Sequence, residues 1–181
     1  CIASFDLKKL LKEMTRAPSD PIKVKRAPGG PIIKPKKDNP WEAKAAFNPG
    51  TVRINNKVHM LYRAMSEDNT SVFGYASSKD GVTIDERLDE PVYTPREDFE
   101  IKKIEGGNSG CEDPRLTDLG DHIYMLYTAF NGVQVPQVAI TRIKKEDFLE
   151  RKWNWERPRL ISPPGSDDKD ACILEEKING K

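Results

Sequence analysis

The sequence has few cysteines, no excess of charge and no long apolar run, and each absence narrows the class of protein. Its three cysteines, Cys1, Cys111 and Cys172, are an odd number without metal-binding spacing, which favours a reducing cytoplasm. The formal net charge is only +1, so the composition predicts neither nucleic acid nor a membrane surface as a partner. No apolar run approaches the ~18 residues of a membrane-spanning helix, and no signal peptide is visible.

The first 40 residues differ in composition and residue pattern from the rest and are predicted to form a separate N-terminal segment. The stretch SFDLKKLLKEM, residues 4–14, spaces its apolar residues as an amphipathic helix does. Six prolines then interrupt a lysine-rich stretch from Pro18 to Pro40, which excludes a helix or central strand and favours an extended arm. A basic nucleic-acid-binding tail is the alternative, but interleaved aromatic residues are missing. We expect the arm to clasp a neighbouring subunit of a homo-oligomer.

Residues 41–181 are predicted to be all-β, because short runs of β-branched and aromatic residues alternate with polar turns. These runs repeat along the chain. HMLYRA at 59–64 returns as YMLYTA at 124–129, and Asn48-Pro49-Gly50 meets Asp113-Pro114-Arg115 at the same offset. YAS at 75–77 meets VAI at 138–140 with a shift of two residues, and INNK at 54–57 returns as INGK at 178–181. The pattern indicates two units and the opening of a third.

Repeats of this length, with about four strands each, are typical of β-propeller blades. Two blades alone would leave apolar faces uncovered. We therefore expect the chain to be the N-terminal part of a propeller, completed by further sequence or by another chain. A self-contained β-sandwich is the alternative, but it would not explain a third unit that begins at the end of the sequence.

Asn48 and Asp113 occupy the same place in successive repeats, and each stands directly before a proline. A residue before proline is held in extended geometry, and a proline at the start of a strand interrupts no ladder hydrogen bond. Since the first strand of a propeller blade lines the central channel, the element would hold one polar side chain at the channel mouth. An ordinary Asx-type turn that leads into a strand is an equally open alternative.

Longer motifs in residues 41–181 resemble glycoside hydrolase family 130. They are FNPGTV, MLYRA, GYASSKDG, GCEDPRLTD, YMLYTAF and KDACILEEKINGK, in the order of that family. The resemblance implies a five-bladed β-propeller that cleaves β-mannosides with inorganic phosphate, inverts the anomeric centre and releases α-mannose 1-phosphate. Phosphate is then a co-substrate, and no metal or other cofactor is implied. The segment before Trp41 carries no comparable motif.

By the same resemblance, Asp113 is the catalytic acid, and its proton reaches the glycosidic oxygen through the 3-hydroxyl of the bound mannose. Asn48 and Arg63 hold the mannose, and Lys169 binds phosphate together with basic residues expected later in the family pattern. The sequence departs from the family in ACILEEK, where relatives commonly have AALFPEK. That change concerns packing rather than chemistry. The chemistry itself needs one proton donor, because phosphate serves as the nucleophile on the opposite face of the sugar.

Glu112 and Arg115 flank the acid and its proline, and we include both among the substrate-binding candidates. Glu112 either increases the proton affinity of Asp113 or points away as the next residue of an extended chain, and we favour the second. Arg115 is expected to pair with Asp113 or Glu112 and is as consistent with a structural role. For Arg63 the alternative is a surface salt bridge.

The remaining candidates have ordinary structural interpretations. His59 and His122 have no cysteine or carboxylate at metal spacing and are expected in the core or on the surface. Trp41, Trp153 and Trp155 are suited to stack on sugar rings but are expected to pack between blades. Two other functions stay open: a β-mannoside hydrolase, in which a carboxylate activates water, and a carbohydrate-binding propeller fragment without catalysis.

Overall fold

The computed structural model describes residues 29–176, and the predicted helix at 4–14 and third unit from residue 178 lie outside them. The described chain is mostly strands. The first four are β1 (Ala45–Ile54), β2 (Lys57–Met65), β3 (Thr70–Ser78) and β4 (Glu86–Arg87). The others are β5 (Ser109–Leu119), β6 (His122–Phe130), β7 (Gln137–Lys144) and β8 (Arg159–Leu160), with the short helix α2 (Lys145–Leu149) after β7. The all-β expectation is confirmed.

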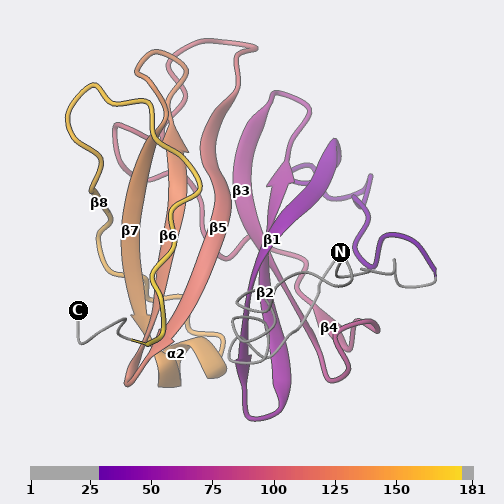
Figure 1. Ribbon diagram of the computed structural model, residues 1–181. Coiled ribbons are helices and arrows are strands. Elements are labelled where there is room, and N and C mark those ends of the chain that lie inside the picture. Colours follow the sequence, from indigo (N-terminus) through magenta and orange to yellow (C-terminus); the bar gives the residue numbers. More distant parts are fainter. Residues whose placement is uncertain (1–28, 177–181) are drawn as a thin grey trace, which may run out of the picture.

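The strands form two antiparallel meanders, which lie side by side in Figure 1. The first meander runs β1-β2-β3-β4 and the second β5-β6-β7-β8. They are joined where Thr70 and Ser71 of β3 pair in parallel with Ser109 and Gly110 of β5. β4 and β5 pair with opposite ends of the same edge of β3. The two meanders therefore form one open sheet of eight strands.

The strand register shows the repeat more sharply than the sequence does. Leu61 pairs with Tyr75 in the first meander, and Leu126 pairs with Ile140 in the second. The offset of 65 residues therefore holds through the third strand of each meander. The predicted two-residue shift, which matched Tyr75 to Val138, was wrong, because similarity of side chains suggested an alignment that the hydrogen-bond ladder does not follow.

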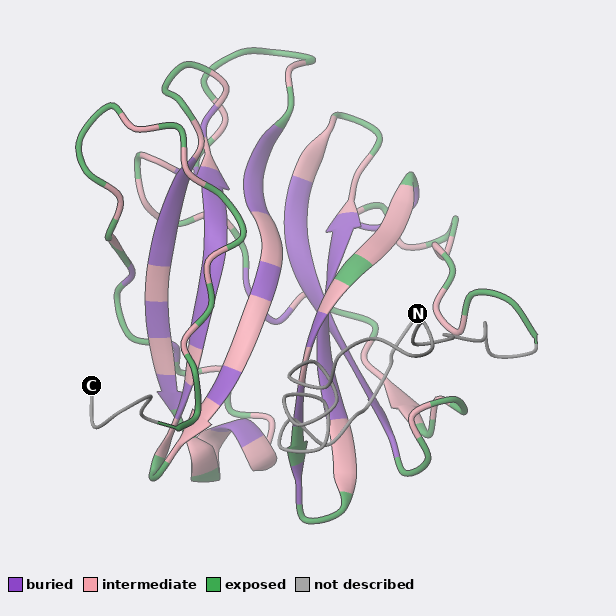
Figure 2. Ribbon diagram, in the orientation of Figure 1, coloured by how far each residue is buried: buried purple, intermediate pink, exposed green. Residues whose placement is uncertain are grey.

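The main core lies between the two meanders. The first contributes Leu61, Phe73 and Tyr75, and the second contributes residues such as Met125 and Tyr127. Figure 2 shows burial along nearly the whole of β2, while buried residues in β5 and β7 are interrupted by partly exposed ones. A strand that is covered on both faces has a nearly continuous apolar sequence instead of an alternating one. This explains the apolar runs in MLYRA of β2 and YMLYTA of β6.

The described part of the N-terminal arm covers the outer face of the first meander. Ile32, Ile33 and Trp41 pack against a second cluster that includes Met60 and Tyr62. Residues 29–40 form no helix or strand, as the prolines predict. Within the described residues no helix is long and apolar enough to cross a membrane.

Each meander carries a β-bulge in its first strand, at the residues that the repeat aligns. The register of β1 shifts between Phe47 and Gly50, and that of β5 shifts between Glu112 and Arg115. The two prolines therefore lie inside strands, at positions where the bulge interrupts the ladder, and the predicted strand start was wrong.

The residue before each proline also differs from its prediction. Asn48 has φ 44° and Asp113 has φ 52°, so both are left-handed rather than extended. Asparagine and aspartate are the residues other than glycine that visit this region most readily, which explains the residue types found there.

Candidate active site

The two bulges bring Asn48 and Asp113 into direct contact. Nδ2 of Asn48 donates a hydrogen bond to Oδ1 of Asp113 at 3.0 Å, across 65 residues of sequence. The strands approach closely at this point, since an added Cβ on Gly50 would lie 2.3 Å from the backbone oxygen of Pro114. The left-handed backbone thus turns an amide and an acid from neighbouring meanders toward one another.

Arg63 of β2 reaches the same acid from the opposite strand of the first meander. Its Nη1 donates to Oδ1 of Asp113 at 3.3 Å, and its Nη2 donates to Oε1 of Glu112 at 2.7 Å. The side chain of Arg63 is only 10% exposed, so the alternative of a surface salt bridge is wrong. A buried guanidinium requires partners of this kind, because its desolvation is otherwise uncompensated.

Glu112 and Asp113, called the acidic pair below, both turn toward Arg63. The expectation that Glu112 points away was wrong, because the bulge removes the strict alternation of side chains that an extended chain would have. Burial raises the pKa of Glu112, and the charge of Asp113 adds to this effect, whereas Arg63 and Lys169 oppose it. One guanidinium therefore serves two carboxylates in a partly desolvated place.

Arg115 does not join the acidic pair. Its Nη2 contacts Oδ1 of Asp170 at 3.1 Å, and its Nη1 donates to the backbone oxygen of Pro114. The predicted pairing with Asp113 or Glu112 was wrong, because the bulge ends between them and Arg115 resumes the regular ladder opposite Leu126.

Lys169 lies beside this C-terminal segment and is exposed. It lines a hollow of about 230 Å³ together with Val138, Ser162 and Asp168. Its positive charge opposes the rise in the pKa of Glu112 that burial causes.

Two residues of this site were missed by the sequence interpretation. The ring of Phe47 lies under the guanidinium of Arg63, with 4.8 Å from Cζ to the ring centroid, and Ser71 accepts a hydrogen bond from Nε at 3.0 Å. Phe47 belongs to the quoted motif FNPGTV and was therefore within reach of sequence reasoning. Ser71 carried no signal, because it meets Arg63 only through the pairing of β2 with β3.

Behind the acidic pair lies a buried network around Glu100. Its Oε1 accepts hydrogen bonds from the hydroxyls of Tyr93 and Tyr127 and a longer one, 3.6 Å, from the thiol of Cys111. Burial raises the pKa of the Cys111 thiol, which stays protonated and able to donate. Because Cys111 directly precedes Glu112, the network fixes β5 where the acidic pair begins.

The histidine and tryptophan candidates take structural positions. His59 is buried, and its Nδ1 lies 2.8 Å from the hydroxyl of Tyr75. Trp153 and Trp155 pack on the main core, and Trp41 stacks on the ring of Tyr62. No cluster of metal-ligating side chains occurs within residues 29–176.

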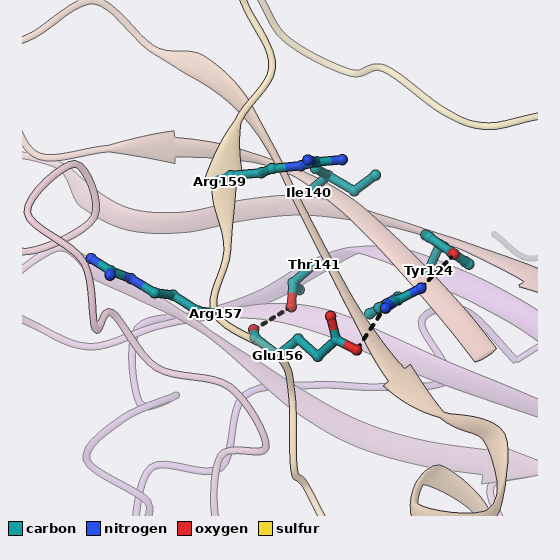
Figure 3. Close-up of a pocket in the computed structure, with 7 residues that line it drawn as sticks. Tyr124, Ile140, Thr141, Glu156, Arg157 and Arg159 are labelled. Atoms are coloured by element: carbon teal, nitrogen blue, oxygen red, sulfur yellow. Dashed lines mark hydrogen bonds and ion pairs between the residues drawn. The ribbon is translucent and has the colours of Figure 1, made fainter.

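A second depression, of about 370 Å³, is lined by residues of β6, β7 and the segment 156–159 (Figure 3). Its guanidinium groups are largely paired: Arg142 contacts Glu156 and Tyr124, and Arg157 contacts Glu97. The depression shares no residue with the acidic pair or its partners. The acid, amide and guanidinium at the bulges are the stronger candidate for chemistry.

The carboxyl of Asp113 is arranged to act through one oxygen. Asn48 and Arg63 both donate to Oδ1, and Oδ2 has no hydrogen-bond partner within the described residues. An oxygen that already accepts two hydrogen bonds is a poor place for a proton, so a proton held here would lie on Oδ2. The site therefore fits a proton donor beside a group of hydroxyl-binding side chains.

Comparison with known proteins identifies relatives over most of the chain. The family model described as beta-1,4-mannooligosaccharide phosphorylase, of glycoside hydrolase family 130, matches residues 15–153. A "Beta-1,2-mannobiose phosphorylase" of Thermoanaerobacter sp. (strain X514) is 35% identical over 88% of this chain and 53% of its own length. A "1,2-beta-oligomannan phosphorylase" of the same strain is 33% identical, over 88% and 52%. The chain thus spans about half the length of these relatives.

A solved structure shares the fold as well as the sequence. It is described as "The GH130 family of mannoside phosphorylases contains glycoside hydrolases that target beta-1,2 mannosidic linkages in Candida mannan". It is 28% identical, with a TM-score of 0.60, over 72% of this chain and 39% of that structure.

Proposed function

This chain belongs to glycoside hydrolase family 130, and from that premise we propose that the whole protein catalyses the phosphorolysis of β-mannosides. The products are α-mannose 1-phosphate and a shortened acceptor sugar. The family membership and the phosphorylases among the relatives support the reaction class. The observation that carries the proposal is the Asp113 carboxyl, held by an amide and a guanidinium on one oxygen and open on the other.

In the proposed mechanism Asp113 is the proton donor. Oδ2 gives its proton to the 3-hydroxyl of the bound mannose, and that hydroxyl gives its own proton to the departing glycosidic oxygen. Phosphate attacks the anomeric carbon from the opposite face, so the bond to the acceptor breaks as the bond to phosphate forms. Asn48 and Arg63 hold the mannose, and Lys169 contributes one cation to the phosphate site, which needs more than one.

We also propose that the two meanders are blades of a five-bladed propeller. In the first meander His59 and Tyr75 lie under Phe148 of the second. The repeat places Tyr124 and Ile140 at the same positions of the second meander, and they line the depression in Figure 3. The sheet face that carries these residues is covered by Phe148 in the first meander but borders a depression in the second. This difference supports a further blade packed against that face of the second meander. We place the complete protein in the cytoplasm as a homo-oligomer, with phosphate as co-substrate and no cofactor.

The reaction is tested by incubating the intact protein with phosphate and either β-1,2- or β-1,4-mannobiose. We expect α-mannose 1-phosphate to form only when phosphate is present, and Asp113→Asn to reduce its rate by at least about 100-fold. Absence of mannose 1-phosphate from every β-mannoside tried would refute the proposal.

A β-mannoside hydrolase is the second candidate, favoured by the description of the solved structure. The phosphate dependence of the reaction distinguishes the two activities, because a hydrolase releases free mannose at the same rate when phosphate is absent. Full activity of Asp113→Asn on mannosides would refute the role of Asp113 as proton donor. No turnover of any β-mannoside, with retained sugar binding, would favour the non-catalytic alternative.

A further inference from the structure

One guanidinium is shared unequally by two carboxylates. The contact of Arg63 with Glu112 is 2.7 Å and that with Asp113 is 3.3 Å, although both acids come from the same bulge. We propose that Glu112 is a positioning residue that holds Arg63 away from full engagement with Asp113, so that the acid retains the proton it must deliver. This inference rests on the proposed function of Asp113 as proton donor.

The position of Arg63 allows its terminal nitrogens to bind either of the two carboxylates. Ser71 fixes Nε at 3.0 Å, and Phe47 covers one face of the guanidinium, so only the two terminal nitrogens face the acidic pair. An arginine with a single carboxylate before it tends to form two parallel hydrogen bonds to that group. With Glu112 present, one of the two nitrogens is already engaged, and Asp113 receives a single longer contact.

The charges around Asp113 affect whether its carboxyl group keeps its proton. A cation within hydrogen-bond reach favours the ionised form of a carboxyl group, and a neighbouring carboxylate disfavours it. Full engagement with Arg63 would ionise Asp113 before substrate arrives and would remove the donor. Glu112 opposes this in two ways, by occupying Arg63 and by placing a second negative charge beside the acid.

The groups that face Glu112 come from three parts of the chain. Arg63 contacts it from β2, Asp113 is its neighbour on β5, and the charges of Lys169 and Asp170 act on it from residues 169–170. Burial acts in the same direction as Asp113 and raises the pKa of Glu112. Arg115 is engaged by Asp170 and is not available to replace Arg63.

The test is the pH dependence of kcat/KM for phosphorolysis by intact Glu112→Gln. Glutamine keeps the size of the side chain, but it removes the charge and replaces the ion pair of 2.7 Å with a weaker neutral hydrogen bond, so that Arg63 can move toward Asp113. We expect the alkaline limb, along which the donor loses its proton, to move to lower pH by about one unit. An alkaline limb that stays in place or moves to higher pH would overturn the inference.

Ser71→Ala is the matched control, because it also disturbs Arg63 without changing any charge. We expect it to alter KM and to leave the alkaline limb where it lies in the wild type. If both variants shift the limb equally, a disturbance of Arg63 explains the shift without any contribution from the carboxylate of Glu112, and the inference is wrong.

A second measurement separates this inference from the proposed reaction. The carboxyl carbon of Asp113 in the intact protein, labelled with ¹³C and followed by NMR, reports its titration without turnover. A midpoint that is lower in Glu112→Gln supports the inference, and an unmoved midpoint refutes it. A wild-type protein that forms no mannose 1-phosphate would refute the reaction and leave this comparison intact.

Discussion

At the scale of single residues, the site uses one backbone shape with two different side chains. Asn48 and Asp113 share a left-handed φ, a following proline and a position in a bulge. The amide at Asn48 is neutral and donates, and the acid at Asp113 accepts. Exchanging an amide for an acid at the first position should therefore change the charge of the site without a change of fold.

Asn48→Asp places a second carboxyl group about 3 Å from Asp113. Two carboxylates at that separation cannot both ionise readily, and the hydrogen bond that stabilises the ionised acid is lost as well. We expect the alkaline limb of the pH–rate profile to move to higher pH, opposite to the shift expected for Glu112→Gln. Steady-state phosphorolysis between about pH 5 and 9 checks the direction.

The control is Asn55→Asp, which adds the same charge at another left-handed asparagine, in the exposed turn between β1 and β2. It should leave the profile unchanged. Equal shifts in the two variants would show that overall charge, rather than contact with Asp113, is responsible.

At the scale of elements, the position of the acid depends on how closely β1 approaches β5. An added Cβ on Gly50 would lie 2.3 Å from the oxygen and 2.8 Å from the carbon of the Pro114 carbonyl group. These are backbone atoms, which cannot rotate away as a side chain can. The contact is therefore a steric requirement for glycine, although Gly50 has no left-handed φ.

Gly50→Ala should destabilise the protein by about 1–3 kcal/mol, because β1 and β5 must separate to admit the methyl group. The same movement pulls Asn48 from Asp113, so kcat should fall along with the midpoint of urea unfolding. Gly107→Ala is the matched control, since its Cβ would lie 3.4 Å from the nearest atom and its φ is not positive. A Gly50→Ala protein as stable as the control would contradict this close approach.

The sequence predicted the strands and their repeat but not the bulges. Alternation and turn residues report which segments pair, and the duplicated HMLYRA and YMLYTA motifs reported the repeat. The only sequence signal of the bulges is the Asn-Pro and Asp-Pro pairs, and these pairs predicted strand starts instead. The helix α2 was also missed, because its five residues are too few to show a helical period.

For the same reason the site was predicted in part. Asp113, Asn48, Arg63 and Glu112 are brought together, whereas Arg115 turns to Asp170. Which side of β5 a residue faces depends on the bulge, so neighbours of Asp113 could not be assigned from alternation alone.

At the scale of the whole molecule, the two meanders are held together by an aromatic interface that includes an uncharged histidine. His59 of β2 packs edge-on against Phe148 of α2, with 5.5 Å between ring centroids. Burial, followed by the charge of Arg151, lowers the pKa of His59 to about 4 from 6.5. The unfolded chain therefore binds this proton more tightly than the folded one does.

Stability should fall on acidification as a result. The contribution of His59 is present above pH 6.5 and is lost as the pH falls toward 4, with about 2 kcal/mol lost between pH 7.5 and pH 5. His59→Gln should remove that part of the pH dependence, measured as urea unfolding free energies at the two pH values. A variant with the same pH dependence as the wild type would show that His59 is not the group responsible.

The twin bulges also make their two central positions interchangeable. Asn48 and Asp113 share one backbone shape and meet through their side chains, so the same scaffold accommodates an amide or an acid at either position. Codons for asparagine and aspartate differ by one nucleotide, so a carboxyl group can be gained or lost at this place without a new loop.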